Sequence, residues 1–211
     1  MVWRALLRDA HRLVESSSWL PGMGPAASGK DYKPLAAPQD GALPFEPPKK
    51  WTSAGGVVLA GPDPEGMSRI WIRKSAANPG YPSQWTFAKG RVDKGETKST
   101  AALREVEEEM GLNASLLAKG YLGSFEGGYS VTHFFLMVAK GSPGRHDKET
   151  EKVALMPWEK AMAAFASTGN SRDVSVCKTA IAHIEKQYGI DALAGEWIDD
   201  EDDVGDRGRR R

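Results

Sequence analysis

The middle of the chain alternates short apolar runs with turn residues, and this pattern predicts a series of β-strands. The runs are rich in β-branched or aromatic side chains, and Gly, Pro, Asn and Asp cluster between them. The predicted strands cover residues 53–60, 69–74, 84–87, 116–125 and 131–139.

Three further segments carry apolar residues at helical spacing and predict helices over residues 98–110, 158–166 and 173–188. Thr97 is a suitable N-cap for the first helix and Gly111 a suitable C-cap. Because strands and helices interleave without regular βαβ spacing, we expect an α/β or α+β sandwich with a mixed sheet.

The two ends of the chain differ from this middle part. Residues 2–15 place apolar side chains and arginines on separate helical faces, which predicts an amphipathic helix that docks on the domain or on a partner subunit. A transit peptide is the alternative interpretation. A proline-rich arm follows, and the chain closes with an acidic run and a basic run. The expected organisation is a helix and arm over 1–50, a domain over 51–190 and a solvated, disordered tail over 191–211.

Composition narrows the class of protein. The 211 residues include 28 Lys+Arg and 28 Asp+Glu, so the formal net charge of zero gives no general attraction to nucleic acid. One cysteine excludes an intramolecular disulfide framework and suits a cytoplasmic protein. No apolar run approaches the roughly 20 residues that span a bilayer, so we expect no membrane partner.

The helix predicted over residues 98–110 concentrates negative charge on one face. Glu105, Glu108 and Glu109 stand at positions i, i+3 and i+4, and Arg104 can pair with Glu108 one turn on. Clustered carboxylates are typical ligands of a hard dication such as Mg²⁺ or Mn²⁺, which in turn favours phosphate-containing substrates. A merely solvated acidic face would not explain the glycines, Glu96 and Arg104 at fixed offsets around it.

Residues 90–112, GRVDKGETKSTAALREVEEEMGL, resemble the Nudix box, G-x5-E-x7-R-E-U-x-E-E-x-G-U, where U is bulky and apolar. Every specified position matches. The resemblance implies a Nudix-type α/β/α sandwich with a loop–helix–loop motif, and a hydrolase acting on a nucleoside diphosphate linked to another group.

The resemblance also implies a role for each residue of the box. Glu108 and Glu109 would be the principal Mg²⁺ or Mn²⁺ ligands, and Glu105 a further ligand or the base that activates water. Arg104 would hold Glu105 by a salt bridge. The remaining contributors would be Glu96, which supports the metal shell, the Gly90 carbonyl, and, if the base lies outside the box, Glu149 or Glu151 in the loop before residues 153–158.

Local sequence gives a partial indication of the substrate. The W-x-x-x-K-G lead-in of residues 85–90 is similar to that of Nudix enzymes acting on dinucleoside polyphosphates, although Ala88 replaces the usual proline. Lys89 could hold a phosphate as a point charge. The other candidate substrate contacts are Arg73, Lys74 and His133 for phosphate, and Trp85 and Tyr129 for base stacking, with ordinary structural roles as the alternative for each.

Three functional hypotheses follow. The first is hydrolysis of dinucleoside polyphosphates, such as diadenosine polyphosphates, to mononucleotides. The second is a nucleotide-sanitising or diphosphoinositol-type phosphohydrolase. The third is a non-catalytic Nudix-like domain that binds ligand or RNA, and the intact carboxylate cluster disfavours it. The expected partner is a small nucleotide or polyphosphate, and a homodimer is possible.

Overall fold

A computed structural model of the chain describes residues 50–198. The predicted docking helix, the proline-rich arm and the charged runs of the tail therefore lie outside the described residues. Among residues 50–198, no helix has both the length and the apolar character needed to cross a membrane.

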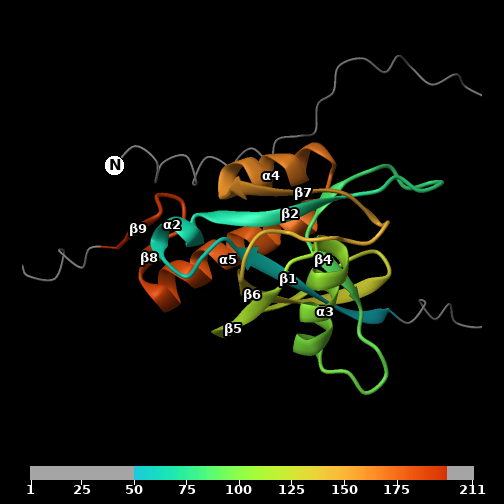
Figure 1. Cartoon of the computed structure of the whole chain (residues 1–211), viewed down its shortest axis with the longest axis horizontal. Coiled ribbons are helices and arrows are strands. Elements are labelled where there is room, and N and C mark those ends of the chain that lie inside the picture. The colour runs from blue at the N-terminus through green and yellow to red at the C-terminus, as the bar shows by residue number, and fades with distance from the viewer. Residues whose placement is uncertain (1–49, 199–211) are drawn as a thin grey trace, which may run out of the picture. The chain divides into compact units, whose positions relative to one another are not determined.

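A mixed sheet forms the centre of the domain (Figure 1). Strand β1 (Trp51–Leu59) pairs in parallel with β6 (Ser130–Ala139) along one edge. Its other edge pairs first with β4 (Ala88–Arg91) and then with β2 (Arg69–Ser75), both antiparallel. The sheet is completed by β3 (Trp85–Thr86), β5 (Ala114–Glu126) and β7 (Thr150–Pro157).

Helices cover both faces of this sheet. Helix α3 (Lys98–Met110) packs on one face through small and apolar residues such as Ala102 and Val106. Helices α4 (Trp158–Ser167) and α5 (Ser171–Tyr188) pack on the other face. Alternation along the strands divides the core, since Val58 faces α3 whereas Val57 and Leu59 face the other two helices. The expected α/β/α sandwich is confirmed.

The ends of α3 form as the sequence predicts. The Thr97 hydroxyl accepts a hydrogen bond from the Thr100 N–H at 3.1 Å. Gly111 adopts a φ of 64°, the left-handed conformation that favours glycine, and its N–H donates to the Glu107 carbonyl. These two caps fix the helix register and therefore the direction of each glutamate.

Four short elements and one strand boundary differ from the prediction. The sequence did not indicate α2 (Pro64–Met67), β4 or the hairpin of β8 (Ile190–Asp191) and β9 (Glu196–Trp197). Buried Ala192 packs in the core beyond the expected domain end at residue 190. Strand β7 begins at Thr150, so the expectation that Glu151 lies in a loop is wrong: pairing with β2 extends the strand toward its N-terminus.

Candidate active site

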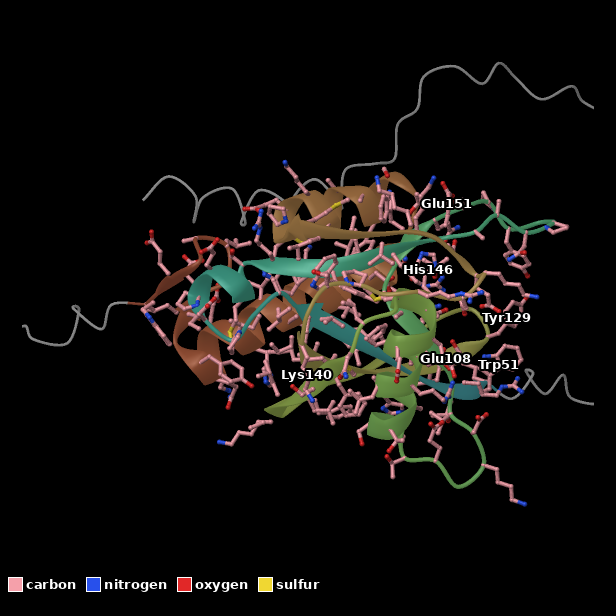
Figure 2. The ribbon with its side chains drawn as sticks, viewed as in Figure 1. Trp51, Glu108, Tyr129, Lys140, His146 and Glu151 are labelled. Atoms are coloured by element: carbon pink, nitrogen blue, oxygen red, sulfur yellow. The ribbon has the colours of Figure 1, made fainter. Side chains whose placement is uncertain are left out.

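The three glutamates of α3 differ in exposure. Glu105 and Glu109 are 8% and 4% exposed because they lie on the side of the helix that meets β4 and β2. Glu108 is exposed and projects from α3 (Figure 2). The predicted shared face is therefore present, with two carboxylates at its buried edge and one at its solvent edge.

Arg104 connects the carboxylates on the solvent side of the site. Its guanidinium donates to both oxygens of Glu96, at 3.1 and 3.0 Å. It also donates to Glu105 at 2.7 Å, to Glu108 at 3.1 Å and to the Arg91 carbonyl at 3.0 Å. Both ion pairs expected for Arg104 are present. The Arg104 hydrogen bond also lowers the pKa of Glu96.

Glu109 lies deeper, between two cationic residues. One of its oxygens accepts from the Arg73 guanidinium, and the other accepts from the Lys89 backbone N–H at 2.7 Å. Burial nevertheless raises the pKa of Glu109 to about 7, against the opposing effect of the Arg73 and Lys89 charges. The two nearby positive charges therefore offset only part of the cost of ionising this carboxylate in a buried place.

Glu105 packs directly against the backbone of Gly90. A Cβ added at Gly90 would lie 2.2 Å from the Glu105 carboxylate atoms, so only glycine admits that carboxylate. Burial raises the pKa of Glu105, and the Arg104 hydrogen bond acts in the opposite direction. The first residue of the box therefore sets the position of a carboxylate fifteen residues further along.

This contact predicts that Gly90→Ala displaces the Glu105 carboxylate, a flexible group, and leaves the fold intact. We expect kcat to fall about 100-fold, as displacement of a reacting group by about 1 Å does. The melting temperature should stay close to that of the wild type. Gly61→Ala is the control, because a Cβ there meets only ordinary contacts from 3.5 Å outward. Equal rates for Gly90→Ala and the wild type would contradict a positioning role.

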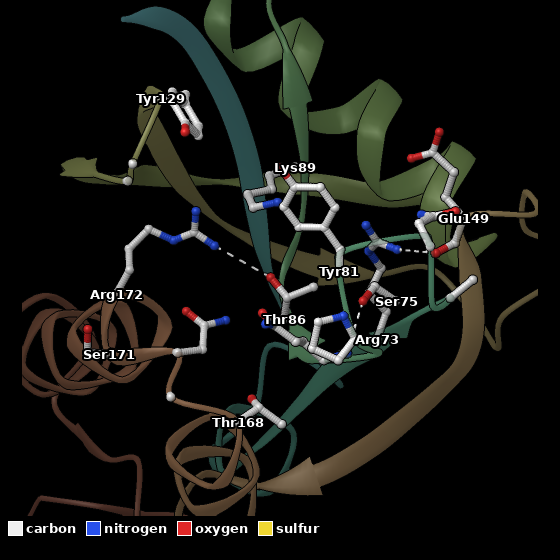
Figure 3. A pocket seen from close by; sticks show the side chains of 18 of the residues that line it. Arg73, Ser75, Tyr81, Thr86, Lys89, Tyr129, Glu149, Thr168, Ser171 and Arg172 are labelled. Carbon is white, nitrogen blue, oxygen red and sulfur yellow. Dashed lines mark hydrogen bonds between the residues drawn. The ribbon is translucent and has the colours of Figure 1, made fainter.

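A cleft of about 750 Å³ opens on the domain, with Arg73 and Lys89 among the residues that line it (Figure 3). Both of these residues donate to the Glu109 carboxylate, so the cleft adjoins the carboxylate cluster. Its walls come from the β2–β3 connection, the β5–β6 turn, the segment before β7 and the start of α5. The cleft therefore connects the carboxylate cluster to a surface that can hold the rest of a substrate.

The structure brings some of the expected substrate contacts to this cleft. Arg73, Lys89, Tyr129 and Glu149 line it. Lys74 instead pairs with Glu151 at 2.9 Å on the exposed surface, and neither residue lines the cleft.

Trp85 and His133 also lie elsewhere. Trp85 packs against the core on the α4–α5 side, so packing decides its position. His133 follows Thr132 and precedes Phe134, whose side chain faces the α4–α5 core, so strand alternation turns His133 to the α3 face. There its Nδ1 lies 2.8 Å from the Tyr121 hydroxyl. His133 therefore does not line the cleft, contrary to the expected phosphate contact.

Two cleft residues, Tyr81 and Arg172, escaped sequence reasoning. Tyr81 lies in the β2–β3 connection and is 70% exposed, and Arg172 lies in the first turn of α5. Turn residues at 78–80 were visible in the sequence, as was the start of a helix near residue 173. Neither signal shows that these segments meet across one cleft.

Arg104 and Arg73 occupy oxygens of the Glu105 and Glu109 carboxylates. Within residues 50–198, no three acidic, His or Cys side chains converge in the manner of a metal site. The donor chemistry nevertheless fits, since carboxylates and a backbone carbonyl are the hard oxygen ligands that Mg²⁺ and Mn²⁺ prefer. Two of the carboxylates are also buried with raised pKa values, so an added cation would stabilise their ionised forms.

Comparison with known proteins gives one family and several similar folds. The NUDIX domain family model matches residues 53–175. A Mycobacterium tuberculosis protein named as a mutator protein, MutT4, is 27% identical over 143 residues, which are 64% of this chain and 57% of that protein. The chain thus spans little more than half the length of that curated relative.

Solved structures share the fold at low sequence identity. A Caenorhabditis elegans Ap4A hydrolase is similar with a TM-score of 0.51 at 19% identity, over 64% of this chain and 98% of that chain. A Nudix hydrolase from Nitrosomonas europaea gives a TM-score of 0.51 at 15% identity, over 64% and 90%. Since the family model covers more than half of the sequence and the box folds as a loop–helix–loop motif on the sandwich, the chain belongs to the Nudix family and its domain is a Nudix hydrolase domain.

Proposed function

We propose that the protein is a metal-dependent pyrophosphohydrolase that cleaves a phosphoanhydride bond in dinucleoside polyphosphates. The observation that carries the proposal is the hydrogen bonding of two cleft residues, Arg73 and Lys89, to Glu109 of the carboxylate cluster. The cluster on α3 therefore adjoins a cleft lined by cationic residues. A substrate with a phosphate chain and aromatic bases matches such a cleft.

Glu105, Glu108 and Glu109, with the Gly90 carbonyl, would hold Mg²⁺ or Mn²⁺, and Glu96 would support them through Arg104. The chemistry that such an ion supplies is Lewis-acid polarisation of a phosphoryl oxygen. Lys89 would hold a phosphate, and Arg73 would keep Glu109 in place. The proton of the attacking water would pass to Glu105 or to Glu149. Glu151 is a weaker candidate for the base because Lys74 and Ser83 engage its carboxylate.

Two exposed tyrosines support the choice of an aromatic substrate. Tyr81 and Tyr129 are 70% and 69% exposed and come from different loops at the cleft. Exposed aromatic rings beside a phosphate-binding floor suit the stacking of a base, which contributes about 1–3 kcal/mol per base. The similarity of the fold to that of an Ap4A hydrolase is consistent with this substrate class.

The name of the mycobacterial relative favours nucleotide-pool sanitising as the second candidate. A panel of diadenosine tetraphosphate, ADP-ribose, 8-oxo-dGTP and a diphosphoinositol polyphosphate, each with Mg²⁺ and the full chain, separates the candidates. We expect kcat/KM for diadenosine tetraphosphate to exceed that of every other substrate by about tenfold or more, a difference of about 1.4 kcal/mol. A kcat/KM for 8-oxo-dGTP that equals or exceeds the value for diadenosine tetraphosphate would overturn the proposed substrate.

A further inference from the structure

Asp173, in the first turn of α5, is a fully buried carboxylate outside the Nudix box. One of its oxygens accepts from the Thr86 hydroxyl at 2.7 Å, the Phe87 N–H at 3.0 Å and the Asn170 amide at 2.8 Å. Its other oxygen accepts from the Arg172 Nε at 2.7 Å. Asp173 therefore ties the beginning of α5 to the β3–β4 junction, and its negative charge is already shared among four donors.

The same contacts fix the direction of Arg172. Its Nε is held by Asp173, and its guanidinium carbon lies 5.7 Å from the centre of the Phe134 ring. One terminal nitrogen makes only a marginal 3.5 Å contact with the Thr86 hydroxyl, and the other faces the β5–β6 turn at Gly127. Arg172 thus enters the cleft from the α5 wall with donors to spare (Figure 3).

Lys89 enters the same cleft from the floor. Within residues 50–198 its Nζ makes no hydrogen bond or ion pair, and Arg172 is the strongest of the charges that act on it. Asp173 engages Arg172 through Nε alone, so the terminal nitrogens of Arg172 and the Nζ of Lys89 share the cleft without an ion pair of their own, which indicates a site for an anion. Of the acids that line the cleft, Glu126 is paired with Lys50, and Glu149 contacts Arg73 through its backbone carbonyl.

We propose that Arg172, oriented by Asp173, binds a phosphate of the substrate beyond the diphosphate that is cleaved, and so selects chains of three or more phosphates. The inference rests on the proposed function for the direction in which the substrate lies. Lys89, whose N–H is bonded to Glu109, would meet a diphosphate held at the carboxylate cluster. Arg172, which enters the cleft on the side away from Arg73 (Figure 3), would meet the next phosphate of a longer chain.

Binding of inorganic phosphates tests this without turnover. Titration calorimetry with Ca²⁺ in place of Mg²⁺, so that the carboxylate cluster can hold a diphosphate, would compare tripolyphosphate with pyrophosphate for the wild type, Arg172→Ala and Lys178→Ala, which removes an exposed charge from the same helix. We expect Arg172→Ala to weaken tripolyphosphate binding about tenfold or more, as loss of a charge-assisted hydrogen bond does, and pyrophosphate binding less than about twofold. Lys178→Ala should match the wild type.

Kinetics supply the second readout. Arg172→Ala should raise KM for diadenosine tetraphosphate about tenfold with kcat changed less than about threefold, and leave ADP-ribose hydrolysis nearly unchanged. Asp173→Asn should also raise KM for diadenosine tetraphosphate relative to KM for ADP-ribose. Arg172→Lys should bind tripolyphosphate more tightly than Arg172→Ala but less tightly than the wild type.

The outcomes separate this inference from the proposed function. Equal weakening for both phosphates, no weakening, or no tripolyphosphate binding by the wild type would each overturn the role of Arg172. If the wild type and Arg172→Ala behave as expected toward inorganic phosphates but diadenosine tetraphosphate is not hydrolysed, the proposed function fails and the anion site stands.

Discussion

Glu108→Gln should lower kcat about a thousandfold and leave the fold intact. Glu108 is the exposed member of the carboxylate cluster, and its one side-chain contact in the described chain is the 3.1 Å pair with Arg104. An exposed pair of this kind contributes little to stability. The amide keeps the size of the side chain but removes the negative charge that a metal ligand needs, and several kcal/mol of transition-state stabilisation depend on that metal.

Glu107→Gln provides the matched control, because Glu107 is its exposed neighbour on α3 and makes no side-chain contact in residues 50–198. Both variants change the charge of the same helix by the same amount. We would measure kcat with Mg²⁺, Mn²⁺ affinity by titration, and the melting temperature. A Glu108→Gln enzyme that turns over like the Glu107→Gln enzyme would contradict the assignment of Glu108 as a metal ligand.

Arg73→Ala should destabilise the metal-free protein above neutral pH, by up to about 3–5 kcal/mol, the range for breaking a buried ion pair by removing one partner. The Arg73 side chain is 5% exposed and pairs with the equally buried Glu109. It also donates to the Glu149 carbonyl and the Thr150 hydroxyl, both at 2.9 Å. Its loss removes the counter-charge of Glu109, whose remaining donor is the Lys89 N–H, and the donor to the Thr150 hydroxyl, whereas the Glu149 carbonyl keeps a bond from the Ala76 N–H at 2.8 Å. Urea unfolding in EDTA measures the effect.

The destabilisation should depend on pH in a defined direction. Burial raises the pKa of Glu109 from an ordinary value of 4.5 to about 7, and Arg73 acts against that rise. Without Arg73 the pKa rises further. A raised folded-state pKa lowers stability progressively between the unfolded and the folded value and has no effect below the unfolded value. Glu109 is protonated below about pH 7 in both folded proteins, so the charge-dependent difference between Arg73→Ala and the wild type should appear above pH 7 and vanish below it.

Two further variants serve as controls for this prediction. Arg69→Ala removes an exposed arginine from the same strand and should unfold like the wild type. Arg73→Met combined with Glu109→Gln removes both charges, so it should recover much of the stability lost by Arg73→Ala. A destabilisation that is the same at pH 5 and pH 8 would show that the uncompensated carboxylate is not its cause.

Sequence reasoning located the carboxylate cluster of this domain because all three glutamates lie on one helix. Spacing of three and four residues places Glu105, Glu108 and Glu109 on one face wherever the helix forms, and the caps at Thr97 and Gly111 fix its ends. The spacing of residues along one helix determines which side chains share a face, so this part of the site can be derived from the sequence. The same reasoning anticipated most of the longer strands, whereas the sandwich with helices on both faces was implied by the resemblance to the Nudix box.

The cleft could not be derived in this way, because its residues meet only through tertiary contacts. Alternation along a strand shows that Arg73 and Lys74 point to opposite faces of the sheet. It does not show which of the two faces the helix that carries Glu109. For His133 the parity was equally ambiguous, and the structure turns it toward Tyr121. Arg172 depends on a contact between Asp173 and Thr86, which lie 87 residues apart in the chain.

The division between a helical box and a loop-built cleft has a consequence for how such enzymes diverge. Tyr81, Tyr129 and Arg172 stand in three separate connections or helix starts, and none of them supports the packing of α3 on the sheet. Insertions or substitutions at these places can change the preferred ligand while the hydrolytic centre is inherited unchanged. Diversification of this scaffold is therefore expected to leave its traces in the loops, and lineages with identical boxes can differ in their metabolic roles.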